Sequence, residues 1–112
     1  MAEKEVPKKI AISKEFLIDL DDIYQHGQYV FGDNQAAKYE DEIWMLIEKL
    51  PENYLIFPEC RYLRTKSRMY RWIILDAHLV IYRITQKEIQ LLRILHSKRS
   101  ISKIKTSRKI TP

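Results

Sequence analysis

Arginine and tyrosine side chains recur in three consecutive apolar runs between residues 69 and 96, where strand pairing could bring them together. Counting inward from the expected hairpins places Arg71, Tyr82 and Arg93 on one face of a sheet. Guanidinium groups bind phosphate through paired hydrogen bonds, and an aromatic ring can stack on a nucleobase. A cationic face that binds nucleic acid is one prediction. The alternative is that the arginines pair with carboxylates while Tyr82 packs against their stems.

Further basic residues border this expected face and enlarge the candidate site. They are Arg61, Arg64, His96, Lys98 and Arg99. A histidine at a strand end can act as a general acid or base, and a structural role is the alternative. The sequence has no glycine-rich phosphate loop, no serine elbow and no local metal-ligand spacing among its histidines. We therefore expect no metal and no cofactor, so any catalysis would depend on Arg, Lys, His or Tyr alone.

Apolar residues alternate with this set and define the opposite face of the expected sheet. Helices are expected to pack on Trp72, Ile74, Leu79, Ile81, Leu92 and Ile94. A two-residue turn at 76–77 sets the register, which pairs Arg71 with Tyr82. It also places Arg93 opposite Val80. A slip of one residue would exchange the two faces.

A short strand and two amphipathic helices precede these runs. Residues 8–13 alternate as a strand, and Ser13 is a candidate N-cap for a helix over residues 14–31. Gly32 is expected to end that helix, and a second helix follows until Pro51 stops it. Two helices joined so closely form an antiparallel hairpin, here with one apolar and one acidic side.

The remaining segments complete the expected order β-α-α-β-β-β-β. Residues 60–64 alternate as a strand before the three apolar runs, and residues 97–104 are expected to form a short helix or turn. This order predicts an α+β fold of two layers, a helical hairpin packed on a mainly antiparallel sheet. We expect one domain over residues 8–105, with flexible charged tails at 1–7 and 106–112.

Charge is divided unequally along the chain, although the net charge is only +5. Residues 15–59 contain eleven Asp or Glu and two Lys, whereas residues 60–112 contain fourteen Lys or Arg and two Asp or Glu. The basic half favours an anionic partner, nucleic acid or an acidic protein segment, and an unevenly charged solvated surface is the alternative. A single cysteine, Cys60, excludes an intramolecular disulfide. With no apolar run of membrane-spanning length and no signal-peptide core, a cytoplasmic location is expected.

Several segments between about Ile10 and Ile104 occur in the order typical of a known family. They are IAISKEFLIDLDDIYQHGQYVFG, LIEKLPEN, CRYLR, YRWIIL and, most specifically, LVIYRI followed by IQLLRILHSKRSI. The chain thereby resembles the RelE/ParE superfamily of bacterial type II toxin–antitoxin toxins, also called plasmid stabilisation proteins. The resemblance implies a separate antitoxin with a disordered C-terminal segment that wraps the toxin. It also implies one of two targets, DNA gyrase for ParE-like members or the ribosomal A site and its mRNA for RelE-like members.

The residues favour the ParE-like branch. RelE-like ribonucleases carry several basic residues on the central strands, and Arg71 and Arg99 occupy two such positions, but Ile73 and Leu79 stand where others would be expected. Such a centre would stabilise a phosphorane transition state poorly. We predict a toxin that binds gyrase through its basic half without chemistry of its own. One alternative is a ribonuclease in which Arg71 and Arg99 hold the phosphate and His96 is the acid or base. The other is a degenerate toxin kept as an antitoxin-binding protein.

Overall fold

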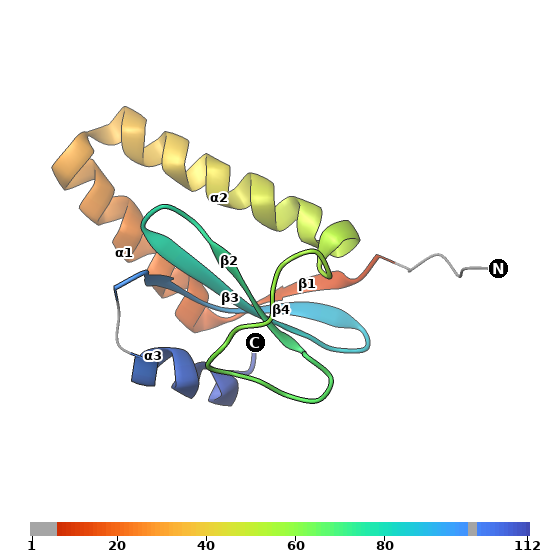
Figure 1. Ribbon diagram of the computed structural model, residues 1–112. Coiled ribbons are helices and arrows are strands. Elements are labelled where there is room, and N and C mark those ends of the chain that lie inside the picture. Colours follow the sequence, from red (N-terminus) through yellow and green to blue (C-terminus); the bar gives the residue numbers. More distant parts are fainter. Residues whose placement is uncertain (1–6, 99–100) are drawn as a thin grey trace.

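A four-stranded mixed sheet forms the centre of the computed structural model, which describes residues 7–98 and 101–112. The strands are β1 (Lys9–Ile12), β2 (Tyr70–Ile74), β3 (His78–Ile84) and β4 (Glu88–His96), in the spatial order β1-β4-β3-β2. β1 runs parallel to β4, and the other pairs are antiparallel. The helices are α1 (Lys14–Phe31), α2 (Asp33–Asn53) and α3 (Ile101–Thr106), as Figure 1 shows. A 3-10 turn, η1 (Ser107–Lys109), follows α3.

α1 and α2 form the predicted helical hairpin and cover one face of the sheet (Figure 1). Ser13 caps α1, because its Oγ accepts a hydrogen bond of 2.9 Å from the N–H of Phe16. The same hydroxyl donates to the carbonyl of Leu92 at 2.7 Å, which ties the start of α1 to β4. Gly32 separates the two helices at a φ of 88°, in the left-handed region that favours glycine. The predicted bounds of α1 are therefore confirmed.

The prediction that Pro51 stops the second helix is wrong, since α2 continues to Asn53. A proline in the last turn removes only its own N–H, the donor that would have reached the carbonyl of Ile47. Leu50 and Tyr54 are both buried at this end. Their packing against the sheet offsets the loss of one hydrogen bond.

The predicted strand at residues 60–64 is also wrong. The chain meets β2 there through an isolated bridge between Glu59 and Arg71 and then forms turns. Trp72 donates its N–H to the carbonyl of Pro58 at 3.2 Å, but proline has no N–H to continue a ladder. Leu63 is fully buried on the sheet beyond. Alternation in this segment therefore reflects burial of single side chains rather than strand pairing.

Both faces of the sheet are apolar, and the helices cover the face opposite to the predicted one. Of the six residues expected beneath the helices, only Ile94 lies there. Ile73, Val80 and Tyr82 contribute to the cluster beneath α1 and α2, which also contains Phe16, Leu20, Ile43, Ile47, Leu50, Tyr54, Ile89, Leu91 and Ile94. We call α1 and α2 the front layer. The other cluster contains Cys60, Leu63, Trp72, Leu79, Ile81, Leu92, Leu95 and Ile104. It is covered by residues 59–69 and by α3 with η1, which we call the back layer. Figure 1 shows α3 on the side of the sheet away from α1 and α2.

A β-bulge in β4 changes the predicted register beyond the confirmed pair of Arg71 and Tyr82. Tyr82 pairs with Leu91, but Ile81 pairs with Arg93, so one extra residue is accommodated between them. Arg93 therefore lies opposite Ile81 rather than Val80 as predicted. The bulge also shifts the alternation of β4, and Arg93 turns toward the helical side, where it meets α1.

The C-terminal segment packs on the back of the sheet. Ile104 is buried, whereas Ile101 is half-exposed. The guanidinium of Arg83 donates to the carbonyls of Arg108 at 3.2 Å and Ile110 at 2.8 Å. These contacts were not indicated by the sequence, which suggested a flexible tail. Among the described residues, no helix is long and apolar enough to span a bilayer.

Candidate functional site

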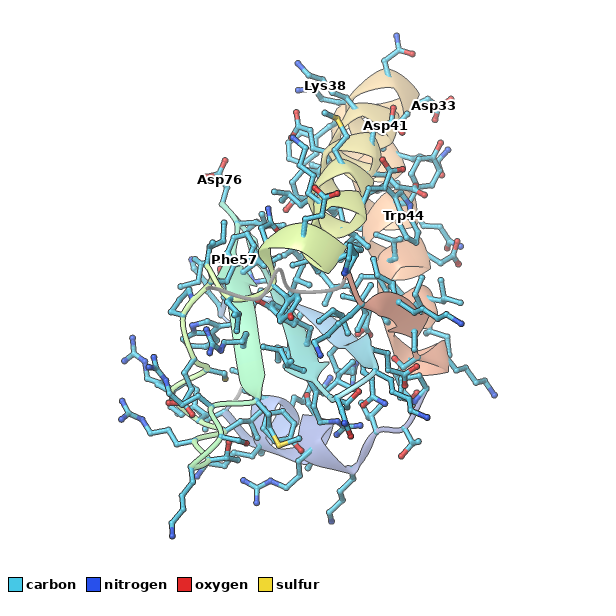
Figure 2. The ribbon with its side chains drawn as sticks, turned by 90° about the vertical axis from the view of Figure 1, so that its right-hand side faces the viewer. Asp33, Lys38, Asp41, Trp44, Phe57 and Asp76 are labelled. Atoms are coloured by element: carbon cyan, nitrogen blue, oxygen red, sulfur yellow. The ribbon has the colours of Figure 1, made fainter. Side chains whose placement is uncertain are left out.

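A cleft of about 830 Å³ opens between the front layer, the turn that joins β2 to β3, and the end of β4. Its walls combine apolar side chains with three histidines and both signs of charge. They include Asp19, Asp22, Ile23, His26, Phe31, Gln35, Ala36, Tyr39, Asp76, His78, Arg93, Ile94, Leu95, His96, Lys98 and Lys103. Figure 2 shows Asp76 projecting outward from the β2–β3 turn at one rim. A concave site with convergent polar groups is where a ligand or a partner segment is expected to bind.

His78 and Tyr39 join the two walls of this cleft. The Tyr39 hydroxyl lies 2.7 Å from Nδ1 of His78, and the His78 and His96 rings meet edge to face at 5.5 Å. Burial lowers the pKa of His78, and the neighbouring His96 and His26 lower it further. Burial also raises the pKa of Tyr39, with Asp76 and Glu42 acting in the same direction. At neutral pH the imidazole of His78 is therefore uncharged and the phenol of Tyr39 is protonated.

Arg93 lies in the cleft but is bound by a carboxylate. Its Nε and Nη2 donate to the two carboxylate oxygens of Asp19 at 2.6 and 2.7 Å. Asp19 Oδ2 also accepts the backbone N–H of Ile94 at 3.1 Å. The hydrogen bond with Asp19 raises the pKa of Arg93. This bidentate pair connects α1 to β4, so Arg93 follows the alternative in which an arginine pairs with a carboxylate.

Arg71 and Tyr82 lie beneath the front layer, so the predicted cationic working face is not formed. Arg71 is 9 % exposed, and its guanidinium donates to the carbonyls of Phe57 at 2.8 Å, Arg68 at 2.9 Å and Leu55 at 3.2 Å. Tyr82 is fully buried, and its hydroxyl donates to the carbonyl of Tyr54 at 2.7 Å. Burial strongly raises the pKa of that hydroxyl. Both side chains satisfy their polar groups inside the protein.

The remaining predicted site residues divide between the cleft and the back layer. His96 and Lys98 are exposed at the rim of the cleft beside Arg93. Arg61 and Arg64 are exposed on the back layer, where the guanidinium carbon of Arg61 lies 5.7 Å from the ring centre of Tyr62. Arg99 lies outside the described residues. The structure thus brings together three of the predicted residues at the cleft and places four others elsewhere, Arg71 and Tyr82 in the interior and Arg61 and Arg64 on the back layer.

Sequence reasoning missed His78, Tyr39 and Asp19 as members of the site. The sequence did indicate His78, because a two-residue turn at 76–77 puts it at a strand end near His96. His78 and His96 do pair in the sheet. Tyr39 and Asp19 are on helices, and nothing local indicates which strand they face. Within the described part of the chain, no group of three His, Cys, Asp or Glu side chains is placed to hold a metal ion.

Solved structures share this fold over most of the chain. The chain matches "Chromosomal ParDE TA system from P. aeruginosa" with a TM-score of 0.69 and 23 % identity, over 82 % of this chain and 98 % of that one. It matches the E. coli DinJ-YafQ toxin–antitoxin complex with a TM-score of 0.51 and 19 % identity, over 81 % and 93 % of the two chains. These likenesses define the class of fold, that of the RelE/ParE toxins.

Sequence comparison identifies the family. Residues 10–101 match the family model described as the ParE toxin of type II toxin–antitoxin system, parDE. Toxin ParE1 of Caulobacter vibrioides is 30 % identical over 89 residues, which are 80 % of this chain and 88 % of that protein. The chain belongs to the ParE toxin family of type II toxin–antitoxin systems. The predicted superfamily, the α+β fold and the toxin function are therefore confirmed, and a cognate antitoxin is its partner.

Proposed function

We propose that this toxin stops growth by binding DNA gyrase and that it performs no chemistry of its own. The burial of Arg71 is the observation that carries the proposal. A ribonuclease of this fold would need cations exposed on the central strands, but Arg71 donates to three main-chain carbonyls. Ile73 and Leu79 occupy positions where a ribonuclease would be expected to carry further cations, and they are 4 % and 7 % exposed. No guanidinium on these strands is free to stabilise a phosphorane within the sheet. Gyrase acts in the bacterial cytoplasm, so the proposal requires the chain to act there.

The cleft suits the antitoxin better than a nucleic acid. Its walls present the apolar side chains of Ile23 and Phe31, together with the exposed cations of Lys98 and Lys103. An antitoxin segment that alternates apolar and acidic residues would bury the first pair and neutralise the second. Association through this cleft should therefore weaken as salt increases.

An assay with purified gyrase tests the proposed target. The full-length toxin, freed from its antitoxin, is added to gyrase and relaxed plasmid. We expect supercoiling to be inhibited and cleaved plasmid to accumulate, and addition of the antitoxin to reverse both effects. Normal supercoiling at toxin concentrations well above that of gyrase would contradict the proposal.

The ribonuclease alternative has one observation in its favour, the exposed His96 beside Lys98 at the rim of the cleft. A translation reaction that reports ribosome-dependent mRNA cleavage tests it. Under the gyrase proposal, growth inhibition persists in His96→Gln as in the control His26→Gln, because neither imidazole does chemistry. Cleavage that is lost in His96→Gln but retained in His26→Gln would instead establish the ribonuclease. The third possibility, a degenerate toxin, requires that induction of the chain leaves growth unchanged.

A further inference from the structure

Exposed cations gather on the back layer without carboxylate partners. Among the described residues, ion pairs are formed only by Arg68 with Glu59, at 3.8 Å, and by Arg93 with Asp19. The exposed cations of the back layer that have no such partner and do not line the cleft are Arg61, Arg64, Lys66, Lys105, Arg108 and Lys109. Unpaired like charges on one surface repel each other, and an anionic partner would remove that cost.

The backbone that carries these cations is held in place. The N–H of Ile84 donates to the carbonyl of Met69 at 2.7 Å, which fixes the base of the loop at residues 60–69. Arg83 fixes η1 by donating to the carbonyl of Arg108. The loop and the C-terminal segment therefore meet the same strand end of β3. Their cations form one surface with a settled arrangement, and binding to it would require little ordering of the main chain.

The chemistry of this surface matches a phosphate backbone better than an acidic protein segment. Protein interfaces have an apolar centre that is depleted of charge, whereas interfaces with nucleic acid are strongly cationic. Among the described residues of the back layer, Ile101 at the start of α3 is the only large apolar side chain that is exposed. Leu63 and Ile104, which lie beneath the cations, are buried. A hollow of about 260 Å³ on this side is lined by Arg61 together with apolar residues such as Ile74 and Ile101. The other cations of the back layer do not line it, so an acidic peptide seated there would leave most of the charge unmatched.

Aromatic rings of β2 beneath the back layer are covered, which favours a duplex over a single strand. Trp72 is only 7 % exposed, and the guanidinium of Arg61 lies 5.9 Å from its ring centre. The ring of Tyr70 lies under the guanidinium of Arg83 at 5.6 Å. Single strands are bound by stacking their bases on open aromatic faces. The back layer supplies cations without such faces, as proteins that hold the outside of a double helix do.

We propose that the back layer binds the phosphate backbone of duplex DNA without sequence preference. The choice of DNA among anionic polymers rests on the proposed gyrase target, because gyrase holds a DNA duplex while the toxin acts on it. The back layer would then bind the same duplex while another surface of the toxin contacts gyrase.

Fluorescence anisotropy with a labelled duplex of random sequence and no gyrase tests this proposal independently of the proposed function. We expect Lys66→Gln/Lys109→Gln to weaken binding roughly 10- to 100-fold at about 100 mM salt and to reduce the salt slope by about 1.8, because two phosphate contacts are lost. The matched control is Lys38→Gln/Lys49→Gln, which removes the same charge from exposed positions on α2. Figure 2 shows Lys38 on the same helix as Asp33 and Asp41. The control should change the affinity less than about threefold, since no phosphate contact is lost.

Three results would overturn the proposal. They are no binding of the duplex at low salt, equal weakening by the two double variants, and tighter binding of the single strand or of polyglutamate than of the duplex. All four substituted lysines are exposed, so thermal unfolding should be unchanged and would show that each variant is folded. A duplex that binds as expected, together with gyrase that is unaffected, would leave this inference standing and remove the proposed target.

Discussion

The front and back layers bury opposite faces of the same four strands with different kinds of chain. The front layer consists of two long helices, α1 of 18 residues and α2 of 21 residues. They carry nearly all the acidic residues of the segment 15–59. The back layer is an irregular loop with a six-residue helix and a 3-10 turn, and its outer surface is cationic. Long helices thus support the sheet on one side, whereas on the other side a loop and short helical turns expose charged side chains to solvent.

This difference separates stability from binding within a small protein. The front layer brings Phe16, Ile43 and Leu50 into one continuous cluster with the sheet. The back layer buries Leu63 and Ile104 but leaves its basic side chains in solvent. Substitutions in the front should therefore act mainly on unfolding, and substitutions of exposed residues in the back mainly on association.

Leucine truncation in each layer should give the largest effects and test whether the front is the stronger support. Leu50 and Leu63 are both fully buried. Leu50→Ala should lower the free energy of unfolding by about 4 kcal/mol, because helices packed on a sheet cannot collapse into the cavity. Leu63→Ala should cost only about 2 to 3 kcal/mol, because the irregular loop can relax. Urea denaturation measures both, with the half-exposed Leu17→Ala as control. Equal losses would mean that the loop is as rigid as the helices.

The sequence predicted the front layer well because helices carry their own signals. The apolar stripe over residues 14–31, the Ser13 cap and Gly32 together determine α1, and each is local. The sequence of the back layer has no comparable apolar stripe at helical spacing. Residues 60–64 alternate, but they are turns whose side chains are buried one at a time. The local sequence pattern could not distinguish a strand from such turns, because the contacts that bury these side chains come from α3, far along the chain.

The assignment of the two faces failed for a related reason. In β2, Trp72 and Ile73 are both buried, one on each side, so alternation of apolar and polar residues gives no direction. The sequence favoured a solvent-exposed face for Arg71. Its guanidinium instead donates hydrogen bonds to main-chain carbonyls of the irregular segment that follows α2. The cleft was partly predictable, since Arg93, His96 and Lys98 are close in sequence. Its helical wall, with Asp19 and Tyr39, depends on tertiary packing alone.

The ion pair between Asp19 and Arg93 is the next test, because it is a polar tie between the front layer and the sheet. Asp19→Asn should lower the free energy of unfolding by about 1 to 3 kcal/mol, less than for a fully buried pair, because the Arg93 side chain is 22 % exposed. The loss should shrink in high salt. Asp21→Asn on the exposed side of α1 is the control and should change little. A loss as small as that of the control would mean that apolar contacts alone hold the front layer in place.

The two layers should also differ in how much a tyrosine hydroxyl stabilises them. Tyr82→Phe removes the buried hydrogen bond to the carbonyl of Tyr54 while the ring remains, and it should cost about 1 to 1.5 kcal/mol. Beneath the back layer, the half-buried hydroxyl of Tyr70 in β2 accepts a longer hydrogen bond of 3.3 Å from Arg83. Tyr70→Phe should therefore cost less than about 0.5 kcal/mol. A reversed order in urea denaturation would show that the back layer depends more on its polar contacts than the front layer does.

The smallest expected effect is a pH dependence at the edge of the front layer, where His78 meets Tyr39. Because the pKa of His78 is lowered on folding, the unfolded chain binds its proton more readily than the folded one. The stabilisation is therefore complete above the unfolded pKa of about 6.5 and is lost as the pH falls below it. Groups around this imidazole include Asp76, His96 and His26, so His96→Gln should reduce the dependence without removing it.

Measurement of unfolding free energy between about pH 7.5 and 5.5 checks this dependence, in a range where most carboxylates stay ionised. His78→Gln should flatten the curve, because the titrating group is gone while a side chain of similar polarity remains. The Arg83 contacts of the back layer involve a tyrosine hydroxyl and main-chain carbonyls and no histidine or carboxylate, so Tyr70→Phe should leave the slope unchanged. A slope that survives in His78→Gln would assign the titration to the exposed histidines and would remove the only pH-sensitive contact proposed between the front layer and the sheet.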